Sequence, residues 1–462
     1  MTNSFRSIIS VYSLLIMLFF TGTIHAQKQR LSIQDVLERV STVLPQLQAM
    51  KEEANAASSQ IALAKNERTP ELNAGYQANL ATYNNITGMS YPGFLLPISG
   101  PPSLNNNIDF VSGSAIGAIF KWSPITFGQS KALIDKATAA FKLSNALYEE
   151  QLFRYQYMAI EVYLRAWYYT AVIKNLQADT ARLTVGLSQS MILAKAGLRP
   201  GIDTAQFQSA IAQSIINLIQ AENQYEQQLI ELCRLTGITT PLKDIELSLQ
   251  PDYSPVLIDT TAENFLSAHP LYRSLESKKA LSYASLEELN KSWRPQLDFW
   301  SNAYARGSGI DAVGNVDKWS GFGFSRTNFG AGVQLSFPIL QFNKINIQKK
   351  KARSLIQADE YLLQQGRLDI QKQINAAYHQ YQNNMKITAQ IPVLLHSAKN
   401  VFEGLQKSYE AGLIDFTRLA QGQYELLKAE VNQTNASLEL WRSVLNLSIA
   451  TGKLSLFADQ LK

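Results

Sequence analysis

Residue types that carry catalysis are sparse in this sequence and are not grouped. Cys233 is the only cysteine, and the four histidines are scattered: His25, His269, His379 and His396. A lone cysteine forms no internal disulfide and no zinc cluster of cysteines, and the helical setting of Cys233 predicts a buried small side chain. Gly307–Gly314 (GSGIDAVG) is not a dinucleotide-binding loop, and Gly113–Gly117 (GSAIG) is not a nucleophile elbow. We therefore expect no enzyme, no cofactor and no metal site.

Two short segments of the sequence combine glycine, charged residues and a break between helical runs. Ala196–Gln213 reads AGLRPGIDTAQFQSAIAQ, and Ala411–Lys428 reads AGLIDFTRLAQGQYELLK. Each begins with Ala-Gly-Leu, bends for a few residues, carries an aspartate and then resumes a helix. Glycine permits the tight reversal, and Asp203 and Asp415 are predicted to cap the helices that follow. Two such turns, 215 residues apart, indicate a duplicated unit built around a helical hairpin.

Long helices must position these turns. No proline interrupts residues 127–196, which predicts a helix of roughly 70 residues, or about 100 Å. Residues 342–411 predict a second helix of the same length. Pro392 lies inside the second long helix and predicts a kink, a bulge or a tolerated local defect. Shorter helices are expected over 32–66, 203–235, 262–291 and 417–451, with Pro45 and Pro270 each interrupting a run and Pro45 falling in the first turn of its second part.

Apolar residues along two of these helices step by three, four or seven, as in coiled coils. One seam includes Ile211, Ile215, Leu218, Tyr225, Leu229 and Leu232, and the other includes Ile391, Leu394, Ala398, Val401 and Leu405. Helices averaging about 11–12 residues are usual in globular proteins, so elements of this length argue against a compact globular domain.

Four segments alternate with a period of two and are predicted strands, at about 71–83, 112–123, 296–306 and 327–337. Each has one apolar face and one face of mainly Asn, Gln and Gly, although Trp300 and Tyr304 fall on the second face of the third strand. Aromatic residues gather near the strand ends, at one level Phe120, Trp122, Trp293 and Phe337, and at the other Tyr83, Phe110, Trp319 and Phe329. Membrane β-strands need about 9–11 residues and show this pattern around a wet lumen.

The first residues and the overall charge limit the location and the partners. Arg6, the apolar run Ile8–Phe20 and the small residues before Gln27 predict a secretory signal peptide over 1–26, the alternative being an anchor helix. No other apolar run reaches about 18 residues, so no helix is expected to span a membrane. A net charge of +5 without a dense basic patch predicts no nucleic-acid partner.

Open edges are not tolerated in lipid, and four strands cannot close a barrel, so the chain must form oligomers to exist in a membrane. A soluble sheet would need an apolar layer to cover it, whereas the helices have the patterns needed to pack on each other. The alternative of a different class is a secreted coiled-coil scaffold or adaptor without a pore. Strands of lipid-spanning length with aromatic ends discriminate against it.

The order of these features resembles the TolC family of outer-membrane efflux channels over essentially all of the mature chain. The resemblance implies a homotrimer, mainly α with a small β part. Four strands per protomer would contribute to a twelve-stranded membrane β-barrel, continued by a long coiled-coil barrel as a periplasmic tunnel. It further implies a passive exit channel of a tripartite efflux or type I secretion system in the cell outer membrane. The implied partners are a periplasmic adaptor (membrane fusion) protein, an inner-membrane transporter of RND, ABC or MFS type, and outer-membrane lipid.

A division into two repeats, 27–240 and 241–462, follows from paired landmarks. Gly197/Gly412 and Gly237/Gly452 are both 215 residues apart, and Pro45/Pro270 and Pro70/Pro295 are both 225 apart. The single change of offset falls at the loop between the strands. The first repeat contains the turn at 196–203 (the first turn), and the second contains the turn at 411–418 (the second turn).

By position, the resemblance places the closed periplasmic end and the adaptor contact on these two turns. The residues are Gly197, Leu198, Arg199, Gly201, Asp203, Gly412, Leu413, Asp415 and Arg418. Charge at a threefold constriction would screen permeants. Arg418 and Gln421 stand near places where family members often carry acidic residues, which counts against an acidic selectivity ring here.

Overall fold

A computed structural model describes residues 29–82, 84, 106, 108–248, 265–311, 313 and 315–461. The signal peptide predicted over 1–26, Tyr83 and most of the loop at 84–109 lie outside the described residues. The chain forms two compact units, each treated separately below. Unit 1 draws on residues 1–52, 145–276 and 362–462, and unit 2 on residues 53–144 and 277–361.

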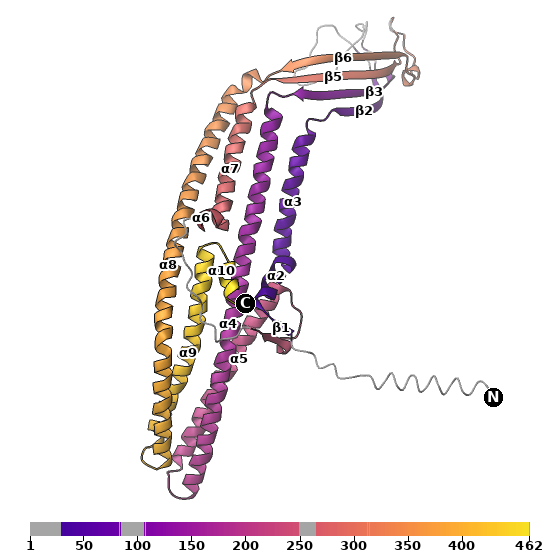
Figure 1. The fold of residues 1–462 in the computed structure, drawn as a ribbon. Helices are drawn as coiled ribbons and strands as arrows, with labels where there is room; N and C mark the ends of the chain where they lie inside the picture. Colours follow the sequence, from indigo (N-terminus) through magenta and orange to yellow (C-terminus); the bar gives the residue numbers. More distant parts are fainter. Residues whose placement is uncertain are drawn as a thin grey trace, which may run out of the picture. The chain divides into compact units, whose positions relative to one another are not determined.

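The protein is mostly helical, as predicted, and the strands are few (Figure 1). The helices are α2 (Ile33–Val43), α3 (Pro45–Asn66), α4 (Gln129–Lys195), α5 (Ile202–Thr236), α6 (Phe265–Ala268), α7 (Pro270–Lys291), α8 (Phe342–Glu410), α9 (Phe416–Ala450) and α10 (Ser455–Ala458). With 67 and 69 residues, α4 and α8 are each about 100 Å long. No described helix combines the length and the apolar character that a membrane span requires.

Local sequence signals decide where several helices begin. Ser32 caps α2 in a capping box, because its side chain accepts from the backbone N–H of Asp35 and the Asp35 side chain accepts from that of Ser32. Pro45 and Pro270 are the first residues of α3 and α7, where the missing N–H costs no intrahelical bond. Pro392 lies inside α8, which continues through it as helix.

The core of unit 1 is built where α2, α4, α5, α9 and α10 meet. Trp441 of α9 and Tyr163 of α4 are among its largest fully buried side chains. A two-stranded parallel ladder of β1 (Gln29–Leu31) and β4 (Ile245–Leu247) joins this core. The Tyr163 hydroxyl donates to the carbonyl of Leu31 (2.9 Å) and accepts from the backbone N–H of Ser248 (3.0 Å), so a buried polar group is satisfied by the ladder.

The predicted seam of α8 meets the core of unit 1 only in part, through Ala398 and Leu405. Val401 is 56% exposed and Leu394 is 44% exposed, whereas the neighbouring Phe402 is buried. The side chains of α8 that pack in the core near the two turns are Leu395, Ala398, Phe402, Leu405 and Tyr409. Along α5, Ile215 of the predicted seam is also exposed, while Leu229 and Leu232 are buried. When a helix has two apolar sides, its heptad pattern does not show which side packs against other helices of the same chain.

Unit 2 contains an antiparallel sheet in the order β2-β3-β5-β6 (Figure 1). The strands are β2 (Glu71–Thr82), β3 (Phe110–Ile125), β5 (Gln296–Ser308) and β6 (Arg326–Ser336). The register pairs Tyr76 with Ile116, Ile116 with Ala305, and Ala305 with Thr327. Paired residues share a face, so the apolar sides of all four strands coincide. We call this the apolar face and the opposite one the polar face.

Glycines explain why Trp300 and Tyr304 depart from the alternation. A Cβ atom added to Gly332 would lie 2.8 Å from the Trp300 ring, and one added to Gly117 would lie 2.6 Å from Cβ of Tyr304. Both aromatic residues are therefore on the polar face, beside strands that carry glycine. The missing side chains make room for the aromatic groups, as in other sheets where aromatic residues cover glycines.

Candidate functional site at the helical turns

The two turns have the same backbone structure. Gly197 and Gly412 have φ values of +74° and +79°, in the left-handed region where a Cβ atom is unfavourable. Leu198 N–H donates to the carbonyl of Leu193, and Leu413 N–H donates to that of Ser408, both at 2.9 Å. These bonds and those of the two glycine N–H groups form the Schellman motif that ends a helix. The glycines of both turns are thus where the reversal predicted from sequence requires them.

The two aspartates play different parts. Asp415 is the N-cap of α9 and accepts from the backbone N–H of Arg418 (3.0 Å), which confirms the capping prediction. The capping prediction for Asp203 was wrong. Gly201 is the N-cap of α5, and Asp203 lies in the first helical turn, where it is 6% exposed. Its carboxylate accepts from the hydroxyl of Tyr409 on α8 (3.0 Å).

Arg199 joins the two turns. Its guanidinium donates to the carbonyls of Tyr409 (2.9 Å) and Ile414 (2.7 Å) and lies 4.6 Å from the centre of the Tyr409 ring. Burial raises the pKa of the Tyr409 hydroxyl, and its bond to the Asp203 carboxylate adds to the rise. Tyr409 therefore stays protonated at neutral pH and remains a donor. We call Arg199, Asp203, Tyr409 and Ile414 the turn latch.

An aromatic cluster supports the turn latch from the side of the helices. The rings of Phe207 and Phe416 are 4.4 Å apart between centroids, and Phe207 also meets Tyr409 edge-on at 6.2 Å. A Cβ atom on Gly186 of α4 would lie 2.3 Å from the Phe207 ring, so this glycine permits α5 to pack closely on α4. The sequence offered no signal for this cluster beyond apolar residues at helical spacing.

The other predicted site residues are accessible. Leu198 is 71% exposed and Leu413 is 77% exposed, and Gly197, Gly201, Gly412 and Arg418 are also exposed. Large exposed apolar side chains are a stronger indication of a binding surface when they recur at two equivalent places. The structure thus separates the predicted residues into two sets. The half-buried Arg199 and the buried Asp203 are each bonded to the second turn or to α8, and the other residues are exposed on the turns.

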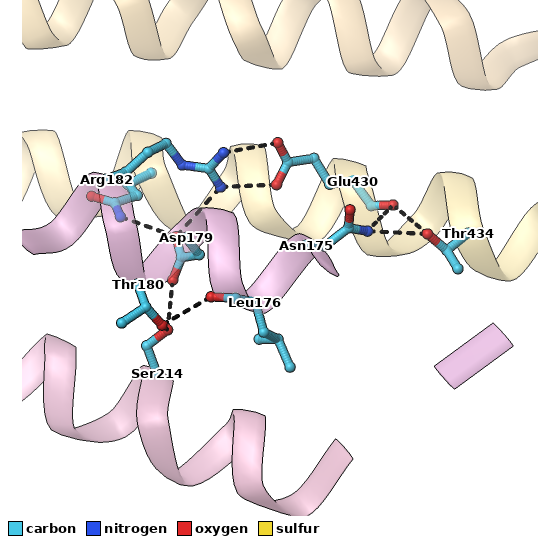
Figure 2. Close-up of polar contacts among 9 residues, drawn as sticks. Asn175, Leu176, Asp179, Thr180, Arg182, Ser214, Glu430 and Thr434 are labelled. Carbon is cyan, nitrogen blue, oxygen red and sulfur yellow. Dashed lines mark hydrogen bonds and ion pairs between the residues drawn. The ribbon is translucent and has the colours of Figure 1, made fainter. Parts of the chain in front are cut away.

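A second polar cluster, which the sequence analysis missed, lies further along α4 (Figure 2). Asp179, only 4% exposed, accepts from Ser214 of α5 (3.1 Å) and from Gln423 of α9 (3.0 Å). Arg182 binds Glu430 of α9 with two hydrogen bonds (3.0 and 2.8 Å). The only signal in the sequence was a pair of opposite charges three residues apart on α4, Asp179 and Arg182. We call these five residues the helix network.

Neither cluster is arranged for metal binding. Within the described ranges, no group of three or more His, Cys, Asp and Glu side chains could hold a metal ion. The acidic groups of both clusters are instead bonded to hydroxyl, amide and guanidinium donors of the same chain. The arrangement suits holding helices together.

The fold is similar to solved outer-membrane channels of low sequence identity. For CusC the TM-score is 0.76 at 12% identity, covering 91% of this chain and 92% of that one. For VceC of Vibrio cholerae it is 0.72 at 13%, covering 91% and 96%. For the open state of the Neisseria gonorrhoeae MtrE channel it is 0.71 at 13%, covering 91% and 89%. At this identity the likeness shows the fold.

The sequence adds a family match. Residues 273–453 match the model of the outer membrane efflux protein family. A sequence comparison with curated proteins finds no match. Both comparisons are with one class of protein, outer-membrane channels and efflux proteins. The family match lies in the second half of the sequence and covers less than half of the chain.

Proposed function

We propose that three copies of this chain form the passive exit channel of a tripartite efflux or type I secretion system. The observation that carries the proposal is the sheet. Its apolar face is exposed, with Leu72 at 69%, Phe329 at 93% and Val333 at 66%. Its outer strands, β2 and β6, each have one edge without a partner strand among the described residues.

An apolar face of this kind needs lipid, and an unpaired edge in lipid needs another strand. Joining β6 of one copy to β2 of the next satisfies both edges. Three copies of four strands make a closed barrel of twelve, within the range of outer-membrane barrels. The polar face, with Asn73, Gln77, Asn302 and Gln334, then lines the lumen.

The helices support the same assembly. Ile387, Leu394 and Val401 of α8 follow one another at steps of seven and are 54%, 44% and 56% exposed. A heptad stripe on the side away from the core is suited to a second helical neighbour. A ring in which every helix has two neighbours supplies it, so we assign this stripe to the contact with the next copy in a periplasmic tunnel. Two similar repeats per chain would place six turns around the axis.

The two turns are the proposed gate and the proposed adaptor contact. The exposed residues Leu198 and Leu413 offer apolar contacts to a periplasmic adaptor, with the glycines and Arg418 beside them. The turn latch holds the two hairpins together, so opening must break its bonds. The adaptor and an inner-membrane transporter would supply that free energy, because the channel has no energy source of its own.

The test is reconstitution of the purified mature protein in a planar bilayer. We expect ion conductance from a heat-labile trimer. A monodisperse monomer in detergent-free buffer would reject the channel and favour the secreted scaffold. For the gate, cysteine at Arg418 in a Cys233→Ala background should cross-link between copies and abolish efflux. Unchanged efflux from fully cross-linked protein would reject the gate at the turns.

A further inference from the structure

Two arginines without a described acceptor lie at the end of the sheet distant from the helices of unit 2. Arg306 of β5 and Arg326 of β6 are directly paired across the two strands. Both are exposed, and neither side chain has a hydrogen bond or an ion pair with the described residues. Arg306 follows Asn302 and Tyr304 at steps of two, so both arginines belong to the polar face.

This pairing is unfavourable for the protein alone. Side chains directly opposite in an antiparallel sheet have Cβ atoms about 4.5–5.5 Å apart, and like charges there destabilise the sheet. A single anion between the two guanidinium groups would remove the repulsion. Arginine also presents its N–H groups as a planar fork that matches phosphate and carboxylate oxygens.

The arginines line a cavity of about 980 Å³ whose wall includes several polar side chains. Gln77 and Asn79 of β2, Ser308 and Asn315 supply amide and hydroxyl groups. Two acidic residues also line it, and they are already engaged in their own loop. Asp311 accepts from the backbone N–H groups of Val313 and Asn315 (both 2.9 Å), and Asp317 accepts from that of Trp319 (3.2 Å).

These groups favour a ligand with one anionic group and many hydroxyls. The free arginine forks suit the anion, while amide and carboxylate side chains are common acceptors and donors for hydroxyl groups. We propose that this cavity binds a phosphorylated carbohydrate, with Arg306 and Arg326 holding its phosphate. The position of the cavity at the outer mouth of the lumen rests on the proposed channel, whereas the binding itself does not.

The binding test uses the detergent-solubilised full assembly and isothermal titration calorimetry. Glucose 6-phosphate is the probe and glucose the neutral comparison. We expect the wild type to bind glucose 6-phosphate, and the double variant Arg306→Gln with Arg326→Gln to bind at least about tenfold more weakly, since a charge-assisted hydrogen bond contributes about one decade in Kd. The affinity of the wild type for glucose should be no higher than the affinity of the double variant for glucose 6-phosphate.

Lys318→Gln is the matched control, because Lys318 is in the same loop, does not line the cavity and is paired with Asp109 at 3.8 Å. It should bind like the wild type. Equal affinities of the wild type and the double variant, or no binding by either, would overturn the proposal. Should the glutamine variant fail to assemble, Arg306→Lys with Arg326→Lys keeps the charge and tests the fork. Unchanged affinity in that variant would equally reject the arginine geometry.

Two sources could supply this chemistry, a glycolipid headgroup of the outer leaflet or a solute in the lumen. Displacement of glucose 6-phosphate by lipopolysaccharide micelles would assign the cavity to the headgroup, and its absence to the solute. Both results support the site. Conductance without binding would reject the site and leave the channel intact, and binding without conductance would reject only the channel.

Discussion

Replacing Arg199 by methionine should release the two turns from each other. The variant keeps most of the aliphatic stem and removes two charge-assisted hydrogen bonds, each worth about 1.5–3 kcal/mol when shielded from water. It also removes a cation–π contact worth about 0.5–1 kcal/mol. Arg199 is half-buried, so solvent screening reduces the sum, and we expect a loss of about 2–3 kcal/mol in the coupling of the turns. That corresponds to a roughly 30- to 150-fold rise in the separated state.

Hydrogen exchange measures this opening directly. The N–H groups of Gly412 and Leu413 are bonded within the second turn, so their exchange reports its local opening. Exchange should accelerate by the factor given above, and the open probability of reconstituted channels should rise. The control is Lys407→Met, because Lys407 is exposed near the same turn, has no described side-chain acceptor and is not among the proposed gate residues.

A second variant tests the other half of the turn latch. Tyr409→Phe removes the donor to the buried Asp203 carboxylate, which should cost about 1–3 kcal/mol. Because both residues act in one cluster, the double variant with Arg199→Met should be less destabilised than the sum of the two single effects. Wild-type exchange rates and wild-type open probability in both single variants would refute the turn latch as a restraint on opening.

Three other changes test other parts of the structure. Arg182→Met leaves the carboxylates of Asp179 and Glu430 in the helix network without their shared cation. Since 24% of the arginine side chain is exposed, we expect the free energy of unfolding to fall by about 3 kcal/mol. The urea midpoint should be lower, and an unchanged midpoint would contradict this. Burial lowers the pKa of His269 in the folded protein. As pH falls below the unfolded value of about 6.5, the unfolded chain gains a proton that the folded chain resists, so stability is lost. The melting temperature should therefore fall more steeply from pH 7 to 5 in the wild type than in His269→Asn, and parallel curves would count against this. Gly332→Val should prevent assembly of the sheet, because the new side chain would collide with the Trp300 ring. The measurement is the amount of heat-labile trimer, which should be lost in this variant and restored by adding Trp300→Ala. Trimer in the single variant would contradict the contact.

Much of the fold was predictable because its signals are local. The four strands alternate with a period of two, and the structure places them within a few residues of the predicted ranges, at Glu71–Thr82, Phe110–Ile125, Gln296–Ser308 and Arg326–Ser336. Prolines and glycines marked helix ends because their backbone preferences act within one or two residues. Asp415 was predictable for the same reason, since an N-cap bonds to an N–H group three residues away.

The candidate site was only half predictable. The turns were found, but the partner of Arg199 and Asp203 was not, because Tyr409 is more than 200 residues away in sequence. The sequence did not show which residues of the α8 seam meet the core, because the helix has apolar residues on two sides, and periodicity does not say which side meets the same chain. The helix network was missed for a similar reason, since Gln423 and Glu430 are separated from Asp179 by most of the chain.

By itself, the sequence determined the long helices, the strands with one apolar side, and the two glycine turns, since each depends on backbone preferences and on spacing within a few residues. The tertiary structure alone decided that the apolar sides of all four strands coincide, which follows from the register of the pairs. It also decided that Arg199 holds the second turn rather than facing solvent. Both results depend on distant segments meeting, and no short-range pattern records which segments will meet.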